Sequence, residues 1–174
     1  MRKSERPLHY VVTATTRPKR AREKDGLDYH FLSRKQFQQM IDKHRFLEWA
    51  NVYGNYYGVP KDEVRPALSK GLDTMVKVDV QGAAAINRIL PQAILIFLMP
   101  PSLKALEKRL KRRRSESSQD LALRLARAEE ETKSLPLFDY VITSDQDKLD
   151  EVVSQIDAIV IAEKCRVEPR IVEL

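Results

Sequence analysis

The succession of apolar runs predicts an α/β fold organised around a largely parallel sheet. Short runs at 8–14, 74–80 and 93–99 alternate with amphipathic segments of helical period, which is typical of strand–helix–strand units. Residues 93–99, AILIFLM, are apolar at every position, and this predicts a strand buried on both faces. Hydrophobic residues make up 43% of the 174 positions. That share is enough for a core and excludes a globally disordered chain.

The N-terminal part of the chain predicts a small β-rich insertion. The run 8–14 is followed by a basic loop, TTRPKRAREKDG, whose Asp-Gly pair at 25–26 marks a turn. Ser33 and Gln36 have the spacing of a capping box, which predicts the start of a helix. The other elements expected here are strands at 29–32 and 46–53, a turn at 54–55, and a helix at 60–68 that Gly71 ends.

The remainder of the chain predicts alternating strands and helices. We expect strands at 74–80, 93–99 and 138–143, and helices at 81–90, 102–114, 120–133 and 147–162. Ser102 is the expected cap of the helix that begins there. Residues 164–174 match no pattern of regular structure.

Charge and cysteine content limit the classes of function. Lys and Arg number 31 and Asp and Glu 25, which makes the net charge +6. The single cysteine, Cys165, allows no internal disulfide, and the three histidines lack metal-ligand spacing. No run approaches the roughly 20 apolar residues of a bilayer span, and the N-terminus has no apolar signal core. We therefore expect a cytoplasmic protein without a membrane partner.

Arg17 and Arg20 are the first candidate functional residues. They flank Pro18 in the loop after the first expected strand, where two guanidinium groups can clamp one phosphate. A solvated basic loop is the alternative interpretation. Tyr29 and Tyr57 carry hydroxyls that could reach a phosphate, although most tyrosines simply pack.

Glu48 and Asp79 are candidate carboxylates. Glu48 lies in an otherwise apolar and aromatic strand, where it could accept hydrogen bonds from two adjacent donors of a base such as guanine. A partly buried structural glutamate is the alternative. Asp79 ends the strand 74–80 before a helix, which resembles the Mg²⁺-side carboxylate of nucleotide-binding sheets. Many α/β strands end in Asp, so Asp79 alone does not identify such a site.

Arg109, Arg113 and Arg124 lie on two successive expected helices. The first two are four residues apart and face one way. A helical hairpin that carries arginines can close over a phosphoryl group and stabilise its charge during transfer. The alternatives are a solvated basic face and a nucleic-acid contact. We do not expect nucleic acid as a partner, because no aromatic residues interleave with the arginines.

Taken together, these segments resemble guanylate kinase, the family that transfers the terminal phosphate of ATP to GMP. The resemblance runs from about Val11 to Ile159 in the family's order and spacing, and its most specific parts are FLEWA, GNYYG and DVQG. The other matching segments are TTRPKR, E-x-DG-x-DY at 23–29, PPS at 100–102, and the arginine-bearing region from Arg109 to Arg124.

The resemblance implies a P-loop-kinase-like parallel sheet flanked by helices, with an inserted small mixed-β lobe and a helical lid. Residues 1–174 would form a single domain. Its GMP-binding lobe would span 28–60, its lid 102–133, and its core 1–27, 61–101 and 134–163.

The resemblance also implies roles for single residues. GMP would be bound by Thr13, Arg17, Arg20, Tyr29, Glu48, Tyr57 and Asp79. The catalytic residues would be Arg20, Arg109, Arg113 and Arg124. ATP would be bound by Arg109, Arg113, Ser144 and Asp145. Mg²⁺ would arrive with ATP and have no direct protein ligand, with Asp79 near it.

Two positions depart from the family's pattern. Val59 stands where a Ser or Thr hydroxyl commonly contacts guanine, so base selectivity would rest more on Glu48 or on backbone groups. Lys77 stands where an acidic residue is common. It would either contact a phosphate or pair with Asp79, and the sequence does not decide between the two.

The ATP phosphate-binding loop of the family is the largest departure. Neither G-x-x-x-x-G-K-[ST] nor G-x-G-x-x-G can be built from the five glycines, which are Gly26, Gly54, Gly58, Gly71 and Gly82. We therefore expect further residues upstream of Met1. We also expect the strands at 74–80 and 93–99 to lack a partner that they share in the family's sheet, so that self-association through unpaired strands is an open alternative.

The sequence thus predicts an enzyme of the guanylate kinase family, with GMP and ATP as partners and the first, P-loop strand of the sheet missing. It leaves open whether these 174 residues catalyse the transfer. The alternative is a non-catalytic guanylate-kinase-like module that binds GMP or phosphopeptides.

Overall fold

The computed structural model describes residues 8–112 and 118–174, and these divide between two compact units. The N-terminal unit contains residues 8–93 and 171–174, and the C-terminal unit contains residues 94–170. The predicted single domain and its inner boundaries stay predictions.

The first sheet of the N-terminal unit is a parallel pair of short strands. β1 (Leu8–Tyr10) pairs with β6 (Asp73–Met75). Both strands are shorter than predicted. The run 8–14 is divided, because Val11 turns into the core with 1% of its surface exposed before β2 begins at Ala14. The run 74–80 leaves the sheet after Met75 and leads into the cap of the next helix.

The second sheet of this unit has four strands in the order β3–β2–β5–β4. β2 (Ala14–Thr15) pairs in parallel with β3 (His30–Phe31), and β5 (Asn55–Pro60) runs antiparallel to both β2 and β4 (Phe46–Val52). Gly54 connects β4 to β5 with a φ of 76°, a left-handed conformation that glycine adopts without strain. The mixed-β insertion that the sequence predicted is present.

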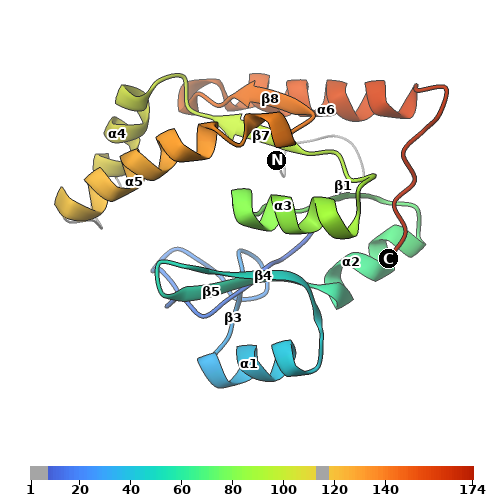
Figure 1. Cartoon of the computed structure of the whole chain (residues 1–174), viewed down its shortest axis with the longest axis horizontal. Coiled ribbons are helices and arrows are strands. Elements are labelled where there is room, and N and C mark those ends of the chain that lie inside the picture. The colour runs from blue at the N-terminus through green and yellow to red at the C-terminus, as the bar shows by residue number, and fades with distance from the viewer. Residues whose placement is uncertain (1–7, 113–117) are drawn as a thin grey trace. The chain divides into compact units, whose positions relative to one another are not determined.

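Two helices cover opposite faces of this four-stranded sheet (Figure 1). α1 (Arg34–Asp42) begins with the predicted capping box between Ser33 and Gln36, and its Phe37 stacks on Phe46 with 4.4 Å between ring centroids. α3 (Val80–Ile89) lies against β4 on the other face. A third helix, α2 (Lys61–Ser69), follows β5 directly.

An irregularity in β4 decides which side chains reach which face. The pairing register of β4 shifts between Phe46 and Glu48. In a regular strand these two residues would share one face. Instead, Phe46 packs against α1, whereas Leu47 joins the core around Val59 and Ile86, and Glu48 reaches Gly82 of α3. A bulge of this kind re-aims a side chain, and here it places a carboxylate against α3.

The C-terminal unit combines a parallel strand pair with three helices. β7 (Ile96–Met99) pairs with β8 (Tyr140–Thr143). The expected burial of β7 on both faces is wrong, because Phe97 is 9% exposed but Leu98 is 45% exposed, the pattern of a sheet covered on one face. The helices are α4 (Leu103–Arg112), α5 (Ser118–Thr132) and α6 (Leu149–Lys164), with 3₁₀ turns at Leu135–Leu137 and Gln146–Lys148.

α4 and α5 pack against each other as the predicted helical hairpin. Ser102 caps α4, since its Oγ accepts a hydrogen bond from the Ala105 N–H at 3.1 Å. Residues 113–117, which join the two helices, lie outside the described residues.

The parallel strands of the described residues do not form one continuous sheet. The pairs β1–β6 and β7–β8 belong to separate sheets. The expected lack of a shared partner for the strands at 74–80 and 93–99 stays a prediction. Among the helices of residues 8–112 and 118–174, none has the length and apolar character that crossing a membrane requires.

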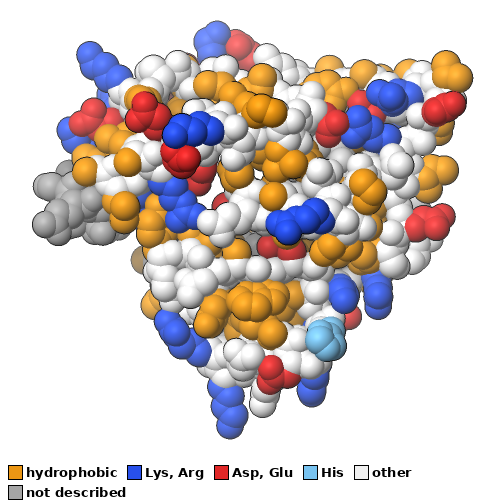
Figure 2. Space-filling view, viewed as in Figure 1, with side chains coloured by type: hydrophobic (Ala, Val, Ile, Leu, Met, Phe, Trp, Pro, Cys, Tyr) orange, Lys and Arg blue, Asp and Glu red, His pale blue; other side chains and the backbone are white. Residues whose placement is uncertain are grey.

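Basic residues are not gathered into one block on the face shown in Figure 2. Lysine and arginine side chains are spread there among acidic and hydrophobic ones. The predicted absence of a nucleic-acid partner stays a prediction.

Candidate functional site

The buried Thr15 anchors the start of the basic loop. Its hydroxyl donates to the Tyr56 carbonyl at 3.0 Å and accepts from the Arg17 N–H at 3.1 Å. Thr15 has no exposed surface, so these two bonds fix the point at which β2 passes into the loop. Sequence reasoning did not identify Thr15, because a threonine at the end of a strand carries no distinctive signal.

The Arg17 guanidinium is held by a carboxylate and by two aromatic rings. It donates to both oxygens of Glu23, at 2.7 and 3.0 Å, and to the Pro18 carbonyl at 2.6 Å. Its Cζ lies 5.6 Å from the Tyr29 ring centroid and 5.7 Å from that of Phe31, within cation–π range. Only 14% of the Arg17 side chain is exposed, so the group is oriented before any ligand binds.

Glu23 also organises Arg20. The Arg20 N–H donates to Glu23 Oε2 at 2.8 Å, and the Arg20 guanidinium lies 3.8 Å from Glu23 Oε1 with 53% of its side chain exposed. Burial raises the pKa of Glu23, but the bonds from Arg17 and from the Arg20 N–H outweigh this and lower it. Glu23 is therefore ionised at neutral pH. Its position in the E-x-DG-x-DY segment was the available signal for it.

Tyr29 and Tyr57 complete this group. Their rings meet edge to face with 6.2 Å between centroids. Burial lowers the pKa of Arg17, but Glu23, and to a smaller extent Tyr57, raise it overall. The structure thus brings Arg17, Tyr29 and Tyr57 together, as the sequence predicted, and places Arg20 beside them at the surface.

Lys77 approaches the same group from the segment between β6 and α3. It is exposed, and its Nζ lies 5.5 Å from the centroid of the Tyr29 ring. The expected strand 74–80 ends at Met75, so Lys77 and Asp79 lie beyond it.

Glu48 is a buried carboxylate next to Asp79. It is 8% exposed, and burial, together with the negative charge of Asp79, raises its pKa to about 7. Asp79 caps α3, with its Oδ1 accepting from the Gly82 N–H at 2.9 Å. Thr13, also 8% exposed, precedes β2 and its carbonyl accepts from the His30 N–H at 2.9 Å.

Gly82 permits the close approach of Glu48 to α3. A Cβ at this position would lie 3.1 Å from Glu48 Oε2 and 2.9 Å from the Val78 Cβ. Only glycine fits this contact without displacement. Val59 lies opposite Glu48 in the β4–β5 ladder and is fully buried, so its side chain belongs to the core and supplies no hydrogen-bond donor beside Glu48.

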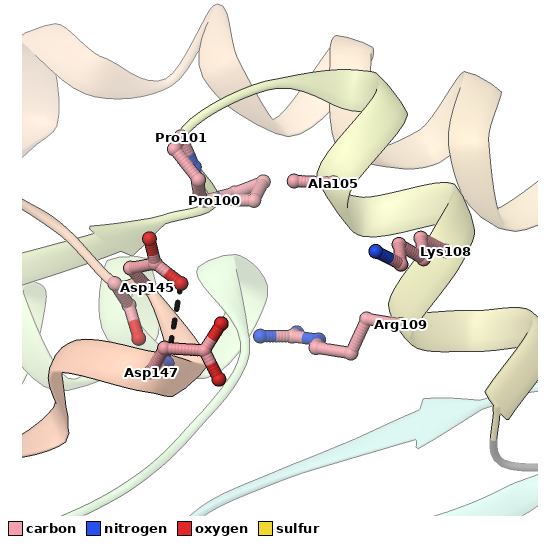
Figure 3. Close-up of a pocket in the computed structure, with 8 residues that line it drawn as sticks. Pro100, Pro101, Ala105, Lys108, Arg109, Asp145 and Asp147 are labelled. Atoms are coloured by element: carbon pink, nitrogen blue, oxygen red, sulfur yellow. Dashed lines mark hydrogen bonds between the residues drawn. The ribbon is translucent and has the colours of Figure 1, made fainter.

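The C-terminal unit contains a polar cavity of about 180 Å³. Figure 3 shows Lys108 and Arg109 extending from α4 toward the segment that carries Asp145 and Asp147. Asp145 Oδ1 accepts from the Asp147 N–H at 3.2 Å, and the Ser144 N–H donates to the Met99 carbonyl at 2.7 Å. The cavity is lined by Pro100, Pro101, Ala105, Lys108, Arg109, Ser144, Asp145 and Asp147.

This cavity contains three of the predicted ATP-side residues, which are Arg109, Ser144 and Asp145. Lys108 and Asp147 were not predicted. Arg124 is half-buried on α5 and is not among the residues that line the cavity. Arg113 lies outside the described residues.

Comparisons with known proteins agree with these features. The guanylate kinase family model matches residues 1–163. The chain is 45% identical over 168 residues to a protein of Oryza sativa subsp. japonica named guanylate kinase 2, chloroplastic/mitochondrial. The match covers 96% of this chain and 59% of the rice protein.

Bacterial relatives match over more of their own length. A guanylate kinase of Carboxydothermus hydrogenoformans is 40% identical over 166 residues, covering 95% of this chain and 80% of the relative. The crystal structure of a guanylate kinase from Anaplasma phagocytophilum superposes with a TM-score of 0.79 at 31% identity. It covers 92% of this chain and 78% of the other.

Proposed function

This chain belongs to the guanylate kinase family, and on that premise we propose that it binds GMP as the acceptor of a phosphoryl group from ATP. The observation that carries the proposal is the cluster of Arg17, Tyr29 and Tyr57. It presents a preoriented guanidinium and two aromatic rings at one place. A guanidinium matches the oxygens of a phosphate in both shape and charge.

The acceptor half of the proposed site divides between phosphate and base. Arg17, Arg20, Tyr29 and Tyr57 bind the phosphate of GMP. Glu48 accepts hydrogen bonds from guanine, and the raised pKa of Glu48 supports this, because a carboxylate buried without cations gains most from two N–H donors. Thr13 and Asp79 line the same part of the N-terminal unit in this proposal.

The donor half of the proposed site uses the cavity of the C-terminal unit. Ser144 and Asp145 face the adenine, and Arg109, Arg113 and Arg124 carry positive charge to the transferring phosphoryl group. Phosphoryl transfer depends on positioning and charge stabilisation rather than on covalent chemistry by the protein. Arginines on a helical hairpin supply both.

Mg²⁺ is proposed as a cofactor that accompanies ATP. In the described residues no group of three or more His, Cys, Asp or Glu side chains could hold a metal ion. Mg²⁺ usually keeps several waters and binds nucleotide phosphates together with one or two protein carboxylates. Asp79, with Glu48 near it, is the carboxylate that suits such a role. The ion neutralises charge on the phosphates when it is bound.

Calorimetric titration of GMP into the purified chain tests the acceptor site. Saturable one-to-one binding, with weaker binding of guanosine, is the expected result. A chain that is folded by circular dichroism and does not bind GMP would contradict the proposal.

A second measurement separates binding from transfer. ADP formation from ATP and GMP in the presence of Mg²⁺ would support the enzyme. Binding of GMP without transfer would support the second candidate, a binding module. That candidate rests on the lack of a G-x-x-x-x-G-K-[ST] pattern in residues 1–174.

Location in the cytoplasm is proposed from the sequence alone. It rests on the single cysteine, which suits a reducing compartment, and fractionation of the source cells tests it. The rice relative is named as a chloroplastic/mitochondrial protein.

A further inference from the structure

Lys77 and Arg17 adjoin the same aromatic ring. The Lys77 Nζ lies 5.5 Å from the Tyr29 centroid and the Arg17 Cζ lies 5.6 Å from it. Tyr29 in turn meets Tyr57 edge to face. A cation from the segment after β6 therefore joins the cluster formed by the basic loop, although the two are distant in sequence.

The charges at this cluster are unbalanced. Arg17, Arg20 and Lys77 contribute three positive charges, and Glu23, which binds the two arginines, contributes one negative charge, so the sum is 3 − 1 = +2. Within residues 8–112 and 118–174, Lys77 forms no ion pair, with Asp79 or with any other carboxylate. The cation–π contact at an exposed site is weak. Lys77 can therefore give up this contact for a stronger ionic contact with a bound anion.

We propose that Lys77 is a third cation of the acceptor-phosphate site and contacts the phosphate of the bound nucleoside monophosphate. This inference rests on the proposed function. Of the two roles that the sequence left open for Lys77, it selects the phosphate contact over an ion pair with Asp79. A phosphate monoester carries a charge of about −1.5 to −2 at neutral pH, which the cluster balances only when Lys77 is included. The ε-ammonium is a compact charge on a flexible stem, and Lys77 is exposed, so it can move toward the phosphate.

The test compares GMP with guanosine, which lacks the phosphate. Both are titrated calorimetrically into the full-length wild type, Lys77→Met, Lys77→Arg and Lys70→Met. Methionine keeps most of the length of the unbranched side chain and removes the ammonium group, with its charge and its N–H donors. Lys70 is an exposed lysine at the end of α2 and serves as the matched control.

We expect Lys77→Met to weaken GMP binding about fivefold to tenfold, the effect of one charge-assisted contact at a partly exposed site. Guanosine binding should not change, Lys77→Arg should restore most of the affinity for GMP, and Lys70→Met should match the wild type. A merely structural role of Lys77 would alter both ligands equally.

Two results would overturn the inference while GMP still binds to the wild type. One is an unchanged GMP affinity in Lys77→Met, and the other is an equal loss for GMP and guanosine. Failure of the folded wild type to bind GMP at all would instead overturn the proposed function, and the role of Lys77 with it.

Discussion

The buried carboxylate of Glu48 makes stability depend on pH in a direction opposite to that of most carboxylates. Burial and the charge of Asp79 raise its pKa from the ordinary value of 4.5 to about 7. Between these two values the unfolded chain has released the proton while the folded chain retains it. The folded state therefore binds more protons, and its stability falls as the pH rises through this window.

The size of the effect follows from the shift. A shift of 7 − 4.5 = 2.5 pH units, at roughly 1.4 kcal/mol per unit, corresponds to about 3 kcal/mol of unfolding free energy. This contribution is present below pH 4.5 and is lost progressively until pH 7. The pKa values of Glu23 and Asp139 are lowered, so these two groups make stability fall as the pH falls. They titrate mainly below pH 4.5 and do not obscure the effect of Glu48 between pH 4.5 and 7.

The assay is urea unfolding of the wild type and of Glu48→Gln at several pH values from about 4.5 to 8. As the pH rises across this range, the unfolding free energy of the wild type should fall by about 3 kcal/mol relative to that of Glu48→Gln. Exposed Glu168→Gln is the matched control and should follow the wild type. Asp79→Asn keeps a good helix cap and removes the negative neighbour, so it should reduce the pH dependence.

Parallel pH profiles for the wild type and Glu48→Gln would refute this reasoning. They would mean that the carboxylate is solvated in the folded protein, and Glu48 would then be no more than a surface group. Saturation with GMP supplies a further check, because two N–H donors would favour the ionised form and remove the pH dependence.

Three other predictions concern single residues. Arg20→Ala should weaken GMP binding by roughly 1.5–3 kcal/mol and leave guanosine binding unchanged, as calorimetry will show, with neighbouring Lys19→Ala as the control; an unchanged GMP affinity would remove Arg20 from the site. Glu48→Gln should weaken GMP binding more than IMP binding, because IMP lacks the exocyclic amine, and equal losses would argue against base recognition by Glu48. Arg170→Ala should lower the unfolding free energy by about 1–2 kcal/mol, since Arg170 pairs with Asp139 at 2.8 Å and with the buried Glu163 at 3.4 Å. Arg166→Ala removes a 51% exposed side chain 3.7 Å from Glu163 and should lower the unfolding free energy less in the same urea experiment. Equal losses for the two variants would contradict a special contribution of the Arg170 ion pairs.

Much of the candidate site was predictable because its residues occur in short, specific segments. TTRPKR contains Arg17 and Arg20, and FLEWANVYGNYYG contains Glu48 and Tyr57. The role of Glu23 was not predicted, because its bond to Arg17 depends on how the loop folds back over six residues. Nor was Asp147 predicted as part of the cavity in the C-terminal unit, since only the turn after β8 places it there.

The sequence by itself determined the features that depend on near neighbours. The capping box of α1, the glycine turn between β4 and β5, the apolar face of α1 and the family's segments are all local patterns, and local backbone preferences are sufficient to encode them.

Only the tertiary structure decided the features that depend on pairing between distant strands. The division of residues 8–14 between two sheets, the shift in β4 that turns Glu48 toward α3, and the approach of Lys77 to Tyr29 are all of this kind. Residue periodicity does not specify the partner of a strand or its register, and a shift of one residue reverses the face to which each side chain points. For this reason the sequence identified which residues matter, while the packing of α3 and the pairing of the strands determined what each of them touches.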